Sequence, residues 1–348
     1  MIEVIYIVRH AFRSNWAVDP QTGTYTALMV KTPTGIPTDP PLTSKGVQQS
    51  KELAEHLCKI QPPIERIYSS PFYRCLQTLQ PTTARLFAEG KVKGKIRVDR
   101  GIGEFFGRAN WEHPSPPTLQ ILTAHFDNLD QEYVSVHMPP AKGEMIVELH
   151  ERVRRALDHI ITTLDNDPEQ PKTVILCTHA ATMIAAGRVL TGQMPDDPDE
   201  EDFHCYTAGL SKFIRRTDGP GKSVVGNWGC ELNSDTSYLS GGAERGWHFN
   251  GEENMIHATE AYAVQADNRL HSPRLQSHEL STSLQRLRLR PNKLIHIPRN
   301  FLVTHAKPTK SRPQILCPYN TYPAAQLQAN RVCIPYQICE RASQRPVA

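Results

Sequence analysis

The sequence predicts an α/β domain with a largely parallel sheet, followed by a basic tail. Short apolar runs rich in β-branched residues alternate with longer amphipathic segments between residues 4 and 190, an order typical of parallel α/β sheets. The charge balance then changes: residues 1–265 hold 26 Lys and Arg against 33 Asp and Glu, whereas residues 266–348 hold 13 against three. We therefore expect a folded body over 1–265 and a separate tail over 266–348.

Three apolar runs are expected to form buried strands of one sheet. Val4–Val8 and Thr173–Cys177 are continuous runs of mostly β-branched residues, and Arg66–Ser69 is a shorter candidate. Runs of this length and composition are typical of strands that are covered on both faces. The sequence alone leaves the order of the strands open.

Four segments with apolar residues at helical spacing are expected to cover that sheet. The first begins at Thr43, a residue type that caps helix N-termini, and Pro81 predicts a kink in the second. The third has the clearest apolar face, with Leu149 and Val153 among its members. The expected helices are Thr43–Leu57, Phe72–Phe87, Gly143–Leu164 and Thr182–Leu190.

Two long loops and one extended region complete the expected body. Ala17–Pro41 is rich in Thr, Pro and Gly, and Met194–Asp202 carries six acidic residues. Because consecutive acids cannot all face one ion, a solvated loop is favoured over a metal site in Met194–Asp202. Gly226–Gly242 is expected to be partly extended, either packed on the body or available to a partner.

Cysteine usage and the start of the chain favour an intracellular protein. The eight Cys include no CxxC pair, which argues against both a zinc site and a disulfide-rich secreted fold. Residues 1–10 (MIEVIYIVRH) lack a basic region and a cleavage site, so we expect no secretory signal. No apolar stretch reaches the length of a transmembrane helix, so no membrane partner is expected. Nucleus and cytoplasm both stay open, because no compact basic run is present.

The tail over 266–348 is expected to be mostly disordered. Its prolines are scattered, and it shows no sustained helical or strand period. Arg286, Arg288 and Arg290 alternate with leucine, a pattern that suits either a weak contact with RNA or DNA or a solvated basic tail. The sequence leaves both interpretations open.

Side chains suited to catalysis follow the expected strands. The first strand ends in Arg9 and His10, the last is followed by His179, and the middle one leads into a helix that bears Arg74. In parallel α/β sheets, ligands bind beyond the carboxyl ends of the strands. This arrangement would bring guanidinium and imidazole groups together around one anion.

Five segments, in order along the chain, resemble sequence blocks of the histidine phosphatases, the phosphoglycerate-mutase-like superfamily. Residues 8–11 (VRHA) resemble its RHG motif, residues 42–49 (LTSKGVQQ) its LTxxGxxQ helix start, and residues 69–78 (SSPFYRCLQT) its SSPxxRxxQT block. Residues 103–107 (GEFFG) look like the segment that carries its acid, and residues 177–180 (CTHA) resemble its second-histidine motif. The resemblance implies a three-layer α/β sandwich.

The resemblance also implies a mechanism, the hydrolysis of phosphomonoesters without a metal or another cofactor. His10 would attack phosphorus and form a phosphohistidine. Glu104 would protonate the leaving oxygen and then take a proton from water. His179 would donate to a phosphoryl oxygen as negative charge builds on it.

The same resemblance implies a phosphate clamp of planar guanidinium groups. Arg9 and Arg74 belong to the motifs, and Arg13 is carried over from some phosphatase branches, with a surface arginine as its alternative. The implied substrate is a phosphorylated small molecule or a phosphoprotein. We assign the choice of substrate to residues 17–41 and 108–142, which match no further pattern.

Two segments look like one particular branch of this family. Residues 9–16 (RHAFRSNW) and 101–107 (GIGEFFG) resemble the fungal branch related to the histidine-phosphatase-domain tau subunit of RNA polymerase III transcription factor C. This likeness and the basic tail favour a second hypothesis, an interaction module with other subunits of that factor as partners and with catalysis dispensable. The complete set of charged and imidazole groups favours an enzyme.

Three residues leave alternatives open at the expected site. Ala11 stands where the family has Gly, which matters if the backbone φ there is positive. Glu144 competes with Glu104 as the acid, although the start of a helix, where the macrodipole favours an acid, suits it as a cap. Cys177 is a nucleophile by residue type, but its place at the end of an apolar strand favours a buried thiol.

Overall fold

The computed structural model describes residues 1–28, 30–217 and 224–250. The expected tail, including Arg286, Arg288 and Arg290, lies outside the described residues, as do residues 251–265 of the expected body. In the described part, no helix is long and apolar enough to cross a membrane.

A mixed six-stranded sheet forms the centre of the fold, in the order β5-β4-β6-β1-β7-β8. The first four of these strands run parallel, and β7 and β8 are antiparallel to their neighbours. The predicted α/β class with a largely parallel sheet is therefore confirmed. The strands are β1 (Val4–Arg9), β4 (Arg66–Ser69), β5 (Arg97–Val98), β6 (Thr173–Thr178), β7 (Leu210–Arg215) and β8 (Trp228–Asp235).

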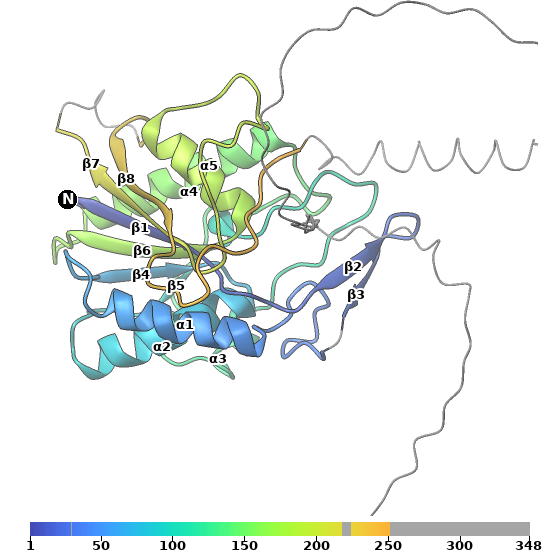
Figure 1. The fold of residues 1–348 in the computed structure, drawn as a ribbon, viewed down its shortest axis with the longest axis horizontal. Helices are drawn as coiled ribbons and strands as arrows, with labels where there is room; N and C mark the ends of the chain where they lie inside the picture. The colour runs from blue at the N-terminus through green and yellow to red at the C-terminus, as the bar shows by residue number, and fades with distance from the viewer. Residues whose placement is uncertain (29, 218–223, 251–348) are drawn as a thin grey trace, which may run out of the picture.

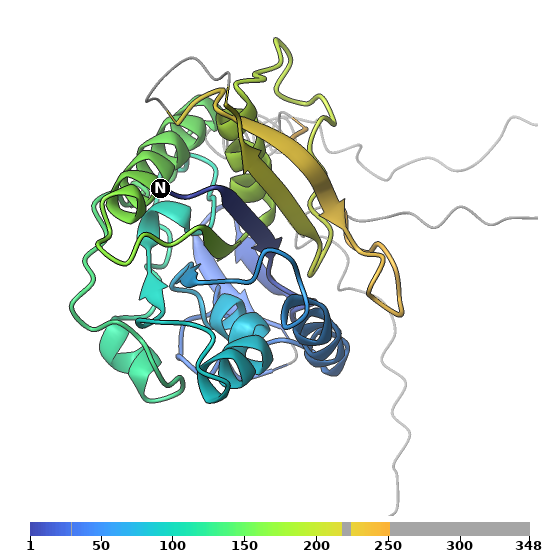
Figure 2. The same ribbon diagram turned by 90° about the vertical axis from the view of Figure 1, so that its left-hand side faces the viewer.

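Helices cover both faces of this sheet and make three layers (Figure 1). Figure 2 shows the same layers from the end at which β1 begins. On one face lie α1 (Ser44–Leu57), α2 (Tyr73–Ala88) and the short α3 (Leu119–Thr123), and on the other lie α4 (Ile146–Asp165) and α5 (Ala180–Thr191). Short helical turns continue the chain between these elements, among them η1 (Arg100–Ile102).

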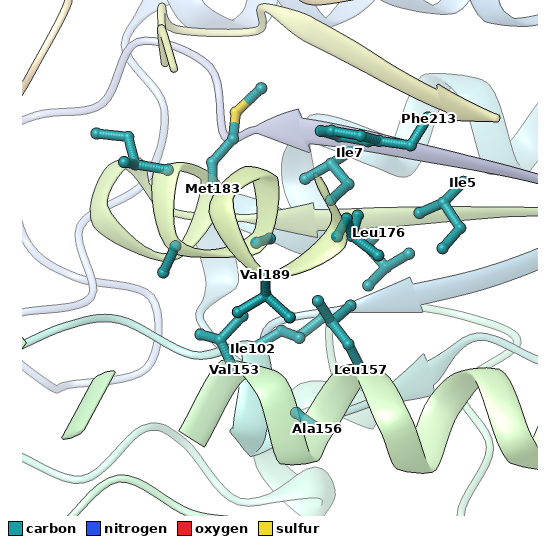
Figure 3. Close-up of a cluster of buried hydrophobic side chains, with 14 of the residues drawn as sticks. Ile5, Ile7, Ile102, Val153, Ala156, Leu157, Leu176, Met183, Val189 and Phe213 are labelled. Atoms are coloured by element: carbon teal, nitrogen blue, oxygen red, sulfur yellow. The ribbon is translucent and has the colours of Figure 1, made fainter. Parts of the chain in front are cut away.

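The buried side chains of β1 alternate between two apolar cores, one on each face of the sheet. Ile5 and Ile7 belong to the core that faces α4 and α5, whereas Val4, Tyr6 and Val8 belong to the core that faces α1 and α2. Figure 3 shows the first of these cores, where the strand side chains meet those of the two helices. Because helices cover both faces of the sheet, the sequences of β1 and β6 are continuous apolar runs.

Helix boundaries follow local signals with small differences from the prediction. Thr43 is the N-cap of α1 as predicted, and its hydroxyl accepts a hydrogen bond from the backbone of Gly46. The helix α4 begins at Ile146 rather than at Gly143, because Gly143 has a positive φ of 77° and Glu144 bridges to Gly107 instead. The helix α2 continues through Pro81.

The two predicted loops contain more structure than expected. Within Ala17–Pro41, the strands β2 (Trp16–Asp19) and β3 (Thr24–Ala27) form a hairpin, which projects beyond the carboxyl end of β1 (Figure 1). In the acidic loop, Asp202 pairs with the buried Arg188, which also donates to the carbonyls of Pro198 and Glu200. The loop therefore closes around an arginine of α5, and among the described residues the one arrangement suited to a metal ion lies elsewhere.

Candidate active site

The two histidines lie side by side because their strands are neighbours in the sheet. Arg9 of β1 pairs with Thr178 of β6, and the backbone N–H of His10 donates to the carbonyl of Thr178 at 2.9 Å. The rings of His10 and His179 are consequently 5.3 Å apart between centroids. The structure thus brings together, at the carboxyl edge of the sheet, the two imidazoles that the sequence placed after separate strands.

His10 is held as a neutral imidazole. Its side chain is buried, and its Nδ1 lies 2.8 Å from the carbonyl oxygen of Ala11. Because a carbonyl oxygen only accepts, we assign the proton to Nδ1, which leaves the lone pair on Nε2. Burial, and then the cationic groups led by Arg74, hold the pKa of His10 well below its ordinary value of 6.5.

His179 is bonded on both ring nitrogens and is buried completely. Its Nε2 lies 2.7 Å from Oγ of Ser70, and its Nδ1 lies 3.2 Å from Oε2 of Glu104. Burial opposes protonation of His179, but the Cys75 sulfur and the Glu104 carboxylate outweigh it and raise its pKa above 6.5. The two histidines therefore have opposite protonation tendencies at adjacent positions.

Arg74 connects the acid to the second histidine. Its Nη2 donates to Oε2 of Glu104 at 2.8 Å and lies 3.2 Å from Nδ1 of His179, while its Nη1 donates to the carbonyl of Thr38 at 2.9 Å. Burial opposes ionisation of Glu104, but His179, Arg74 and Arg13 outweigh it and hold its pKa well below 4.5. Glu104 is thus a carboxylate in the resting site.

Arg9 and Arg13 complete the cationic surroundings of His10. Nη1 of Arg9 donates to the carbonyls of Cys205 at 2.6 Å and Arg245 at 2.5 Å. Arg13 lies close enough to lower the pKa of both His10 and Glu104, and its guanidinium is 5.8 Å from the ring centroid of Trp16. All the charged residues predicted for the site are therefore gathered at one place, while their roles remain predictions.

Two donors in this cluster are left without a partner. The Nε atoms of Arg9 and Arg74 are buried and have no hydrogen-bond acceptor among the residues that the structure describes. A buried donor without an acceptor is costly, and guanidinium groups match the oxygens of phosphate. The arrangement is suited to an anion that supplies the missing acceptors.

The same residues are a poor match for a metal ion. One ligand atom each from His10, Glu104 and His179 lies within 4.8 Å of the others, which is the spacing of a small metal site. However, the Arg74 guanidinium already bonds the Glu104 carboxylate and contacts His179. Because this fixed cation would face the metal directly, the electrostatics favour an anion at this point.

Several residues of the family blocks hold the loop that follows His10 in place. A Cβ on Gly46 would lie 2.0 Å from the carbonyl oxygen of Phe12, so only glycine fits at that helix start. The N–H of Ala11 donates to Oγ1 of Thr78 at 2.9 Å, and Gln49 accepts from the N–H of Phe12. The backbone of Ala11 is not in the left-handed region, so alanine is accommodated there in place of glycine.

Glu144 does not cap the helix α4, contrary to what the sequence suggested. Glu148 makes that contact by accepting from the N–H of Met145 at 2.7 Å. Instead, the buried Glu144 forms a bidentate pair with Arg152, whose Nη1 donates to the carbonyl of Gly101 at 2.7 Å. The pair therefore supports the loop that carries Glu104, and Glu144 contacts neither histidine among the bonds of the described residues.

Sequence reasoning missed three residues that hold the site. Arg152 stands within the apolar stripe of α4, next to Val153, and a charge in such a stripe was the available signal. Asp39 is buried at 3.4 Å from Nη1 of Arg74 and also accepts from the N–H of Tyr73 at the start of α2. Burial raises the pKa of Asp39 to about 6. Ser70 belongs to a family block, but nothing in the sequence showed that it contacts His179.

Parts of both segments assigned to substrate choice lie beside the site. The hairpin β2–β3 packs on Phe106 through Trp16 and Tyr25. Residues 113–116 and 139–141 line a small hollow of about 40 Å³ together with Glu104 and aromatic neighbours. Cys177 is a fully buried thiol, as the sequence favoured.

The family model described as histidine phosphatase superfamily (branch 1) matches residues 5–227. This match spans more than half of the chain, and it includes both histidines and the other charged residues predicted for the site. The protein belongs to the histidine phosphatase superfamily, which confirms the family that the sequence blocks resembled.

Curated relatives include a transcription factor subunit and a phosphatase. The chain is 31% identical over 270 residues to the transcription factor tau 55 kDa subunit of Saccharomyces cerevisiae, a match that covers 72% of this chain and 59% of that protein. It is 30% identical over 172 residues to the ecdysteroid-phosphate phosphatase of Drosophila melanogaster, covering 48% of this chain and 22% of that protein. The chain thus spans about three fifths of the yeast relative and under a quarter of the fly relative. The likeness to a tau subunit is confirmed.

Two solved phosphatase structures are similar to the greater part of this chain. The crystal structure of the silkworm ecdysone phosphate phosphatase with tungstate is 22% identical in sequence, covers 61% of this chain and 88% of that chain, and has a TM-score of 0.46. The mycobacterial glucosyl-3-phosphoglycerate phosphatase is 18% identical, covers 67% and 98% of the two chains, and has a TM-score of 0.40.

Proposed function

We propose that this protein hydrolyses phosphomonoesters through a phosphohistidine on His10, without a metal or another cofactor. The observation that carries the proposal is a buried, neutral imidazole among guanidinium groups, two of which have buried donors without an acceptor in the described part of the chain. A neutral imidazole is a nucleophile at neutral pH. A phosphoryl group beside it would supply the acceptors that Arg9 and Arg74 lack.

In the first step, Nε2 of His10 forms a bond to phosphorus while the bond from phosphorus to the ester oxygen breaks. The positive charge that develops on the ring is stabilised by the carbonyl of Ala11, which accepts from Nδ1. Arg9, Arg74 and Arg13 offset the charge on the phosphoryl oxygens, and His179 donates to one of them from Nδ1, whose contact with Glu104 the phosphoryl oxygen replaces.

Glu104 supplies the proton that the leaving oxygen takes up. In the resting site its pKa is held low by His179 and Arg74, against the effect of burial. A phosphate dianion shares those two cations and adds negative charge beside the carboxylate, so its arrival raises the pKa of Glu104, which takes up a proton from solvent before the first step. In the second step, water attacks phosphorus, the bond from phosphorus to His10 breaks, and Glu104 takes back a proton from the water.

The proposed substrate is a phosphorylated small molecule or a phosphoprotein. Residues 113–116 and 139–141 line a hollow with Glu104, and Tyr25 packs on Phe106, which supports the proposed role of the segments 17–41 and 108–142 in choosing it. We propose the body over 1–265 as the unit that carries this chemistry, with 266–348 as a separate tail.

The decisive experiment follows the release of nitrophenol from p-nitrophenyl phosphate by the metal-free protein between pH 5 and 8. We expect turnover that His10→Ala abolishes, while His159→Ala, which removes a histidine of α4 outside the site and outside both segments assigned to substrate choice, leaves it intact. Circular dichroism and thermal melting establish that each variant is folded. No turnover by the folded wild-type protein would reject the proposal.

The yeast relative supports a second candidate function, a subunit of an RNA polymerase III transcription factor complex. A curated tau subunit that matches 72% of this chain favours membership of such a complex, and with it a nuclear location. Weak nucleic-acid contact by the basic tail would belong to that role. Affinity purification of the full chain from its own cells tests this: recovery of other factor subunits supports assembly, and recovery of the chain alone argues against it.

A further inference from the structure

The segment that follows β8 returns across the carboxyl end of β1. Glu244 accepts at its carbonyl from the N–H of Thr207 at 3.0 Å. Further along, Phe249 is buried at 1% exposure against Phe105 and His150. Residues 236–250, which we term the return segment, are therefore fixed to the body, and they lie beyond residues 5–227 matched by the family model.

Arg245, in the middle of the return segment, contacts the last residue of β1 and two residues of the loop that follows it. Its carbonyl accepts from Nη1 of Arg9 at 2.5 Å, and its own Nη1 donates to the carbonyl of Arg13 at 3.3 Å. Its guanidinium carbon lies 3.8 Å from the ring centroid of Phe12, a stacking distance. The side chain is thus placed beside the two arginines proposed to hold phosphate.

The backbone of Arg245 is held in an unfavourable conformation. Its φ is 49°, in the left-handed region that residues with a Cβ rarely adopt. Such a conformation persists only where the surroundings impose it, and it is found preferentially at binding sites. Here the bond from Arg9 to the Arg245 carbonyl is one of the contacts that impose it.

The charge of Arg245 is only partly offset by its neighbours. Burial and then the Arg9 guanidinium lower the pKa of Arg245, and the Glu244 carboxylate opposes them with a smaller effect. The adjacent carboxylate of Glu244 is paired with Lys45 and lies 3.5 Å from the Gln49 amide. Within the described part of the chain, neither Arg9 nor Arg245 forms an ion pair with a carboxylate.

A single bound phosphate leaves the positive charge of Arg245 without a matching anion. Arg74 keeps Asp39 as a carboxylate partner when Glu104 is protonated, and the phosphate dianion lies against Arg9 and Arg74. Arg245 would then remain a half-buried cation beside Arg9 without an anion of its own, an arrangement that costs free energy. A second negative group on the ligand would remove that cost.

We propose that Arg245 forms a second anion subsite beside the phosphate site. The preferred substrates are then phosphomonoesters whose alcohol carries another anionic group, either a carboxylate or a second phosphate. This inference rests on the proposed function for the phosphate site, and it names the substrate class of that site.

The test compares matched ligands that differ in the second anion alone. Alkyl phosphates of two to five carbons are paired with carboxyalkyl phosphates and alkanediol bisphosphates of the same length. The release of inorganic phosphate gives kcat/KM, and calorimetry gives the dissociation constant. The variants are Arg245→Asn, which tolerates the left-handed backbone, Arg245→Lys, which keeps the charge, and Arg154→Asn, a control on an exposed face of α4.

We expect the wild-type protein to favour a doubly anionic ligand of suitable length over its alkyl partner by about tenfold to a hundredfold, the range for one charge-assisted hydrogen bond. The preference is measured as the ratio of the values for the doubly anionic ligand and its alkyl partner within each variant. Arg245→Asn brings that ratio close to one, Arg245→Lys keeps part of it, and Arg154→Asn leaves the wild-type ratio unchanged. The best-bound partner identifies the second anion as carboxylate or phosphate.

The outcomes separate this inference from the proposed function. Hydrolysis of every ligand without an Arg245-dependent preference overturns the second subsite and leaves the phosphatase intact. Binding of the doubly anionic ligands that depends on Arg245, in a protein that hydrolyses none of them, supports the subsite and rejects the phosphatase. Binding of no ligand rejects both.

Discussion

Two buried Arg–Glu pairs stand close together in this molecule and have different capacities for further bonding. In the first, Arg152 uses Nε, Nη1 and Nη2 on Glu144 and on the carbonyls of the Gly101–Glu104 loop. In the second, Arg74 bonds Glu104, Thr38 and Asp39 but leaves Nε buried without an acceptor among the described residues. The two pairs are alike in burial and residue type, and they differ in that Arg74 keeps a donor for a further partner whereas every donor nitrogen of Arg152 is already bonded.

The largest expected effects come from removing each arginine in turn. We expect Arg74→Met to lower kcat/KM by about 100- to 1000-fold, the cost of losing a preorganised donor to the phosphoryl oxygens. We expect Arg152→Met to lower the free energy of unfolding by about 3–5 kcal/mol, because it leaves the Glu144 carboxylate buried without its cation. Steady-state kinetics and urea unfolding measure the two effects. The comparison fails if Arg152→Met lowers activity as strongly as Arg74→Met while its unfolding curve is unchanged.

A second, smaller effect tests the acid in the second pair, Glu104. We expect Glu104→Gln to lower kcat by about 100-fold or more for an alkyl phosphate, since general acid catalysis contributes in that range. The loss is smaller for p-nitrophenyl phosphate, because nitrophenolate leaves without needing a proton. Glu144→Gln is the matched control, and its kcat ratio between the two substrates stays at the wild-type value. Equal losses on both substrates in Glu104→Gln would contradict its role as the acid.

The smallest effect is a shift in the pH dependence of kcat/KM, which reports groups of the free enzyme. The pKa of His179 is raised above 6.5, where burial is outweighed by Cys75 and Glu104. The protonated form needed to stabilise the phosphoryl oxygens therefore persists above that pH, and activity falls only as the pH rises through the raised value. A phosphomonoester is already a dianion over that range. We expect His179→Asn to lose this basic limb, and a limb retained in that variant would argue that another group titrates.

The strands and most helices were predictable because their signals are local. Val4–Val8 and Thr173–Cys177 were expected as strands, and they lie within β1 and β6, where both faces are covered. Thr43 caps its helix as its residue type suggested. The strand β7 was missed because LSKFIR (residues 210–215) mixes polar and apolar residues, as an antiparallel strand toward the edge of a sheet permits.

The site was predictable where a residue stands next to a strand end or inside a family block. His10, His179 and Arg74 met these conditions, and the structure places them together. Asp39 and Arg152 did not, because a loop carboxylate and a charge in an apolar helix stripe acquire a role only from the partner that the fold brings to them.

The amino-acid sequence by itself determined the α/β class, the family and the identity of the residues around His10. It did so because periodicity and short motifs are set by contacts between residues close in the chain. The tertiary structure alone decided which arginine keeps an unused donor, which acid supports the site from behind, and that Arg245 reaches Arg9 from 236 residues away. Those properties depend on the balance of charge and hydrogen bonds in a buried space, and that balance exists only once distant segments have packed together.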